Sequence, residues 1–112
     1  MKDKKVAQKV EQFCRNVLRL HHQVHISQIR FLAAVARHSP DGATQTAISK
    51  ELGVSLAAVS RLVDVFGPST YKDRSGRAGF GFVQKRKDRA DDRAKVLSIT
   101  DTGLVFLNSL VS

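Results

Sequence analysis

The chain contains 112 residues, of which 42% are hydrophobic, so it can bury one modest core and is expected to form a single domain. Its 19 Lys and Arg residues outnumber its 10 Asp and Glu residues and give a formal net charge of +9, which favours a polyanion, above all nucleic acid, as the partner. No apolar run approaches the roughly 20 residues that span a bilayer, and no apolar signal core follows the polar start. We therefore expect a cytoplasmic protein that does not enter a membrane.

The first predicted element is a helix over residues 3–20. Its apolar residues recur every three or four positions and form one stripe: Val6, Val10, Phe13, Cys14 and Val17. This stripe must be covered by another surface, and Cys14, the only cysteine, is expected to pack there as a core residue rather than to act in redox chemistry. The basic residues of this segment are either a solvated helix face, which we favour, or a second phosphate contact.

Three histidines follow this helix. His21, His22 and His25 include a pair spaced four apart, which could place two metal ligands on one helical face. They lie where the helix should end and no carboxylate is adjacent, so we interpret them as residues near the negative end of the helix dipole. We predict no metal, no cofactor and no enzymatic activity, because the chain lacks cysteine-rich zinc spacing, a phosphate-binding glycine loop and paired catalytic carboxylates.

The central segment predicts a helix-turn-helix over residues 44–66, supported from behind by a helix over 27–37. A helix over 45–52 would end at Gly53, which can adopt the left-handed conformation of a tight turn, and Ser55 would cap a second helix that runs to Phe66. The outer face of this second helix is short-chained and polar, as suits a helix in a DNA major groove. That face comprises Ala57, Ala58, Ser60, Arg61 and Asp64. An ordinary helical hairpin is the alternative.

Two strands are predicted directly after the helix-turn-helix, over residues 82–86 and 95–99, and a charged tip separates them. A two-stranded ribbon in this place is a wing. The predicted fold is therefore mainly α with a small β-wing, a winged helix-turn-helix. We divide the single domain into an N-terminal helix over 1–25, the winged helix-turn-helix over 26–99 and a short apolar C-terminal helix over 100–112.

Four segments carry a resemblance to a known family: residues 28–32, 43–49, 59–64 and 88–103. The most specific is Asp91-Asp92-Arg93, followed by a strand and then by Thr100 and Gly103. Together they closely resemble the MarR family of bacterial winged-helix transcription regulators. The resemblance implies a dimeric, nucleoid-associated regulator, a repressor or an activator, that places one recognition helix per subunit in successive major grooves. It also implies that each wing reaches a minor groove, with Asp91 orienting Arg93 and with Arg89 at the tip.

Two features depart from the family pattern. The chain inserts residues 67–81 before the first wing strand, where Lys72, Arg74 and Arg77 could grip phosphate, although a mobile loop is the favoured interpretation without DNA. The final helix is short where the family has long helices, which makes a small-molecule effector doubtful.

The residues expected at double-stranded DNA lie on the helix-turn-helix, the insertion and the wing. They are Thr44, Gln45, Ser55, Ala57, Ala58, Ser60, Arg61, Lys72, Arg74, Arg77, Lys87, Arg89 and Arg93. We expect a homodimer in which the stripe from Val6 to Val17 packs with Leu104, Leu107, Leu110 and Val111, since neither stripe is needed inside the winged helix. The function expected is that of a sequence-specific transcription regulator, most simply a repressor. The alternative is a winged-helix accessory or adaptor protein in replication, partition or protein assembly.

Overall fold

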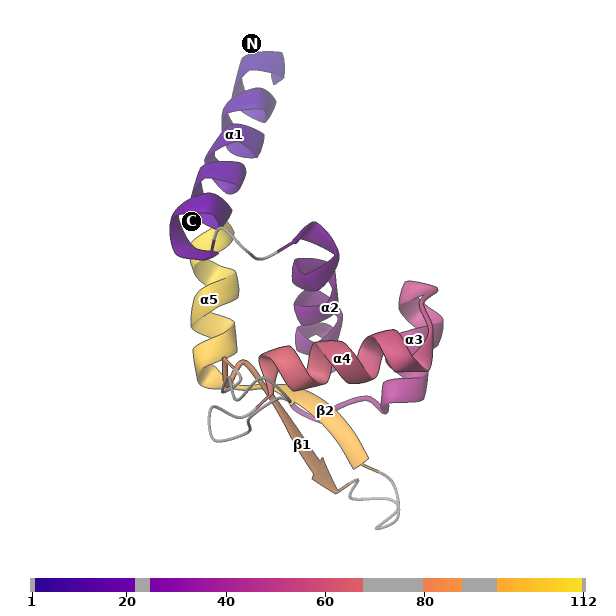
Figure 1. Ribbon diagram of the computed structural model, residues 1–112. Helices are drawn as coiled ribbons and strands as arrows, with labels where there is room; N and C mark the ends of the chain where they lie inside the picture. Colours follow the sequence, from indigo (N-terminus) through magenta and orange to yellow (C-terminus); the bar gives the residue numbers. More distant parts are fainter. Residues whose placement is uncertain (1, 22–24, 68–79, 88–94, 112) are drawn as a thin grey trace.

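The computed structural model describes residues 2–21, 25–67, 80–87 and 95–111, without the side chains of residues 2, 20, 21 and 87. The elements follow in the order α1 (Lys2–His21), α2 (Ile26–Arg37), α3 (Gln45–Leu52), α4 (Leu56–Phe66), β1 (Val83–Lys87), β2 (Lys95–Ile99) and α5 (Asp101–Val111). This is the predicted winged helix-turn-helix. The helix α1 and the wing, formed by β1 and β2, lie at opposite ends of the molecule (Figure 1), whose longest extent is 53 Å.

The predicted bounds of the helix-turn-helix are confirmed. Local interactions fix where each of its two helices begins and where α3 ends. Thr44 caps α3, since its Oγ1 accepts a hydrogen bond from the Ala47 amide at 3.1 Å. Gly53 ends α3 at a φ of +69°, in the left-handed region that glycine enters without steric cost. The hydroxyl of Ser55 then accepts from the Ala58 amide at 3.0 Å and starts α4.

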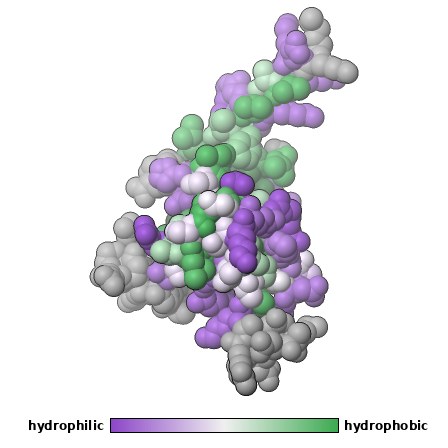
Figure 2. All heavy atoms as spheres, turned by 90° about the vertical axis from the view of Figure 1, so that its right-hand side faces the viewer, coloured by the Kyte–Doolittle hydropathy of each residue, from purple (hydrophilic) through white to green (hydrophobic). Residues whose placement is uncertain are grey.

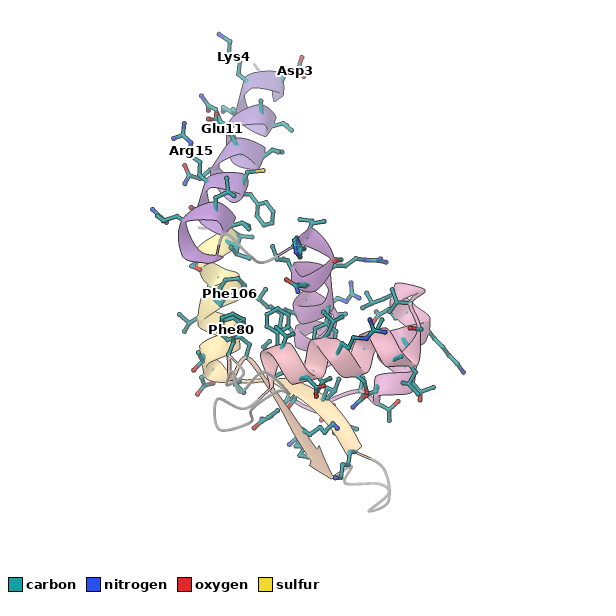
Figure 3. All side chains as sticks on the ribbon, viewed as in Figure 1. Asp3, Lys4, Glu11, Arg15, Phe80 and Phe106 are labelled. Carbon is teal, nitrogen blue, oxygen red and sulfur yellow. The ribbon has the colours of Figure 1, made fainter. Side chains whose placement is uncertain are left out.

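The core is organised around a stack of phenylalanine rings. The Phe66 ring, at the end of α4, lies 6.3 Å from Phe31 of α2, 5.6 Å from Phe80 and 6.0 Å from Phe82 between ring centroids. Phe82 continues the stack to Phe106 of α5 at 4.8 Å. Phe80 and Phe106 lie on the side of α5 that faces α2 and α4 (Figure 3). The stack therefore joins four parts of the chain that are distant in sequence.

The wing is an antiparallel pair in which Val83 lies opposite Ile99 and Lys87 lies opposite Lys95. On its other edge β2 forms an isolated bridge with Ala43, so Leu97 has backbone neighbours on both sides. The first strand begins one residue later than predicted. Phe82 stays outside the ladder because its amide donates to the Phe66 carbonyl, at 2.9 Å, and its ring is buried in the core.

The contact between α1 and α5 corrects the expectation that neither terminal stripe is needed inside the winged helix, because both stripes pack against its core. Phe13 and Val17 are half-buried against the core, as is Leu107, and Leu110 is 2% exposed. The two helices therefore pack together within one chain. Cys14, predicted as a core residue, is exposed, because it lies beside the face of α1 that meets α5.

The histidine prediction is also wrong for His25. This residue is the N-cap of α2, and its amide donates to Gln28 Oε1 at 2.8 Å, so it lies at a positive helix end. His22 and the side chain of His21 fall outside the described part of the chain.

Gly103 is required where α5 crosses the start of the wing. A Cβ atom at this position would lie 2.3 Å from the Phe82 carbonyl oxygen and 2.9 Å from Ile99 Cδ1, so backbone would have to move. We expect Gly103→Ala to lower the free energy of unfolding by about 2–3 kcal/mol through this overlap. Gly53→Ala, which meets nothing within 4 Å, should cost only about 1 kcal/mol from its left-handed φ. Urea denaturation measures both, and equal stabilities of the two variants would contradict the close approach.

Candidate nucleic-acid interface

The recognition helix α4 separates a buried side from an exposed one. Val59, Val63 and Phe66 are buried, and the opposite side presents exposed Ala57, Ser60, Arg61 and Asp64. Four of the five predicted outer-face residues are thus fully accessible, and the side chains are short except for Arg61. Within the described residues, Arg61 forms no ion pair. A guanidinium with free donors on such a face is able to bind a base edge or a phosphate.

Ala58, the fifth predicted residue, is half-buried and lies in the wall of a groove rather than on the outer face. This open groove of about 300 Å³ runs between the start of α2, the turn after α3 and α4. Its lining is mainly apolar, and Arg30 and Arg61 also line it. Arg30 donates to the Leu52 carbonyl at 3.3 Å and so closes the end of α3. The sequence analysis missed Arg30 and the groove, because their position depends on how α2 crosses α4.

Four polar residues predicted at the DNA interact with the helix-turn-helix itself. The oxygens of Thr44 and Ser55 cap α3 and α4, while each hydroxyl keeps its own proton for an acceptor such as phosphate. Ser60 donates to Gln45 Oε1 at 3.2 Å. The structure therefore brings Gln45 and Ser60 together from different helices at one point of the exposed surface.

Several basic side chains near the helix-turn-helix and in the wing already have partners. Arg37 Nη2 lies 2.5 Å from Glu51 Oε1, and His38 Nε2 lies 3.2 Å from Glu51 Oε2, which holds the end of α2 against α3. In the wing, Arg86 is half-buried and donates to the Pro40 carbonyl. These residues hold elements in place and contribute less to the positive surface than their number suggests.

Lys85 and Lys95 are the exposed cations of the described wing. In the ladder, the backbone of Lys95 pairs with that of Lys87. The side chain of Lys87 and the predicted tip residues Arg89, Asp91 and Arg93 lie outside what the structure describes. Their roles remain predictions.

The insertion before the wing has closely spaced ends. The amides of Phe80, Gly81 and Phe82 donate to the carbonyls of Val65, Gly67 and Phe66 at 3.1, 2.6 and 2.9 Å. Residues 80 and 81, predicted as part of an irregular loop, are therefore fixed on the end of α4. Lys72, Arg74 and Arg77 fall outside the described residues.

Two further properties bear on the kind of site. Among the described residues, no three His, Cys, Asp or Glu side chains gather as metal ligands. None of the described helices has the length and apolar character needed to cross a membrane. On the face toward α3, hydrophilic side chains cover much of the lower body, and hydrophobic ones gather along α1 (Figure 2).

Comparison with known proteins supports the geometry. Residues 22–66, which include α2, α3 and α4, match the model of the MarR family. The S. aureus MepR–DNA complex has a TM-score of 0.65 at 21% identity, over 95% of this chain and 76% of that chain. Wild-type MarR from E. coli, in its apo form, has a TM-score of 0.66 at 17% identity, over 93% of this chain and 66% of that chain.

The transcriptional regulator SlyA gives a TM-score of 0.63 at 14% identity, over 98% of this chain and 68% of that chain. No curated protein sequence gives a match. As the sequence resemblance predicted, the chain has the winged-helix fold of these regulators, and its helix-turn-helix matches the MarR family model.

Proposed function

We propose that this protein is a sequence-specific, double-stranded DNA-binding transcription regulator of the cytoplasm and nucleoid, most simply a dimeric repressor. The observation that carries the proposal is the exposed, short-chained face of α4, with the exposed Arg61 at its edge beside the groove, inside a segment that matches the MarR family. Among the relatives, MepR has been solved with DNA bound to it. The proposed contacts are α4 in the major groove and the wing in the adjacent minor groove.

Arg61 and Ser60 are proposed to contact bases from α4, and Arg61 is the more informative to remove. A bidentate Arg contact to guanine provides about 1–3 kcal/mol of discrimination, so Arg61→Ala should lose roughly tenfold or more in affinity and relax one position of the site. The matched control is Arg15→Ala, which removes an exposed Arg paired with Glu11 on α1, far from α4. Fluorescence anisotropy on duplexes selected from random sequence measures both variants. An Arg61→Ala protein with unchanged affinity and preferred sequence would refute this assignment.

The wing and the insertion are proposed to contribute phosphate and minor-groove contacts. Arg89→Gln should lower the slope of log affinity against log salt by about one, and replacing Lys72, Arg74 and Arg77 together by Gln should lower it by about three. The insertion leaves and rejoins the fold at hydrogen-bonded positions, so these changes should leave the free energy of unfolding nearly unchanged. Unaltered slopes with unaltered affinity would exclude contacts from both segments. If the DNA affinity of the parent protein does not depend on salt concentration, the alternative role in protein assembly is favoured.

We further propose that the protein is a homodimer that uses the exposed part of α1 together with α5. Val6 and Val10 are 61% and 57% exposed, and α5 presents Leu104, Val105 and Val111 at 45%, 68% and 79%. Because Leu104 and Val111 are seven residues apart, they share one face of α5. An apolar surface of this kind on two adjacent helices is typical of an interface between subunits.

The variant Val10→Asp should disrupt this interface, because it would place a charge in a desolvated contact. We expect the dissociation constant of the dimer to rise at least about tenfold, which corresponds to roughly 1.4 kcal/mol. The control Gln8→Asp introduces the same charge on the opposite, exposed side of α1 and should leave the dimer intact. Analytical ultracentrifugation at micromolar concentration measures both. A monomeric parent that binds each half-site independently would contradict the proposal.

A further inference from the structure

Asn16 is a buried polar residue in the contact between α1 and α5. It is 2% exposed, and within the described part of the chain only Ser98 is a polar residue of comparable burial. Its Nδ2 donates to the Leu110 carbonyl at 3.2 Å, while its Oδ1 accepts from Gln12 Nε2 at 2.9 Å and from Arg19 Nη2 at 3.4 Å. The amide is thus hydrogen-bonded on both of its ends.

Asn16 binds the carbonyl of Leu110, which has no hydrogen-bond donor available within α5. Leu110 lies in the last turn of α5 (Asp101–Val111), where carbonyl groups have no partner within the helix. Phe13, Val17 and Leu107 around this bond are apolar and can slide against one another at little cost. If α1 moved along α5 by one turn, both the amide and the carbonyl would be buried without partners. The bond therefore selects one register between the two helices.

The opposite end of α5 is fixed to the wing. Thr100 Oγ1 donates to the Gly81 carbonyl at 2.6 Å and accepts from the Gly103 amide at 3.1 Å. The close approach of Gly103 to the Phe82 carbonyl leaves no room for movement there. As a result α5, which lies between α1 and the wing (Figure 1), is a rigid connection, and Asn16 is the polar contact at its far end.

We infer that Asn16 is a positioning residue that sets the separation of the two recognition helices in the dimer, and hence the half-site spacing that the protein accepts. The inference rests on the proposed dimer. From Asn16 to Val6, α1 extends about 15 Å beyond the contact, so a change of angle at Asn16 alters how the two subunits face each other. Over a molecule 53 Å long, a small rotation moves α4 by several ångström. One base pair corresponds to only about 3.4 Å along DNA.

The first test measures the separation directly and needs no DNA. In a Cys14→Ser background, Lys50→Cys places one spin label per subunit on an exposed site of α3, and double electron–electron resonance gives the distance between the two labels. We expect one narrow distance for the parent and for Gln12→Ala, which keeps the bond from Asn16 to Leu110. Asn16→Leu, similar in size but without a donor, should shift or broaden the distribution. Asn16→Ala is measured beside it because it cannot overpack the contact.

The second test uses palindromic duplexes in which one or two base pairs are inserted or removed between the half-sites. The parent should prefer one spacing, and Asn16→Leu should reduce that preference by at least about fivefold while the affinity for a single half-site stays unchanged. A parent-like spacing profile and a narrow, unshifted label distance in both Asn16 variants would overturn the inference. A parent without dipolar coupling would refute the dimer, and with it the role of Asn16. A parent protein that gives a narrow label distance but binds no DNA would refute the DNA-binding proposal and the half-site spacing, while the label distances would still decide whether Asn16 sets the separation of the subunits.

Discussion

The packing of the Phe66 ring at the end of α4 is the contact on which the arrangement of the helix-turn-helix and the wing depends. The ring is fully buried and stacks on Phe31, Phe80 and Phe82, and so joins α4 to α2 and to the residues before the wing. Each aromatic pair contributes about 0.5–1.5 kcal/mol beyond area burial, and burial of the ring itself contributes more. Because Phe66 ends the recognition helix, this energy fixes the helix and the wing relative to each other.

Backbone hydrogen bonds stabilise the same junction between the end of α4 and the start of the wing. The carbonyls at the end of α4 have no helical partners, and the amides of residues 80–82 satisfy them. The carbonyls of Gly81 and Phe82 in turn accept hydrogen bonds from Thr100, whose hydroxyl caps α5. Residues 80–82 therefore belong to three elements at once: the end of α4, the start of the wing and the start of α5. The inserted segment is tolerated because both of its ends meet here, so its length does not change the path of the fold.

Local signals in the sequence were sufficient for the helix-turn-helix, since Thr44, Gly53 and Ser55 act on residues within four positions of themselves. The same holds for the two wing strands, whose bounds were predicted within one residue. The errors concern contacts between distant segments. Periodicity marked Phe13 and Val17 as apolar but could not tell a partner subunit from α5 of the same chain, and it could not show that Phe80 completes a stack on Phe66. The groove beside Ala58 depends on the angle at which α2 crosses α4, and the residue types at single positions do not indicate that angle.

The distribution of cations shows why net charge is a poor count of DNA contacts. Arg30 and Arg86 donate to backbone carbonyls and Arg37 is paired with Glu51, so these three guanidinium groups stabilise the fold around the proposed interface. Arg61, Lys85 and Lys95 are exposed. The basic residues of α1 lie at the end of the molecule opposite the wing and can contribute to the long-range positive field that attracts DNA, but not to base readout by α4. Under the proposed function, steering and base recognition use different parts of the chain, and the proposed major-groove contacts come from the few side chains on the outer face of α4.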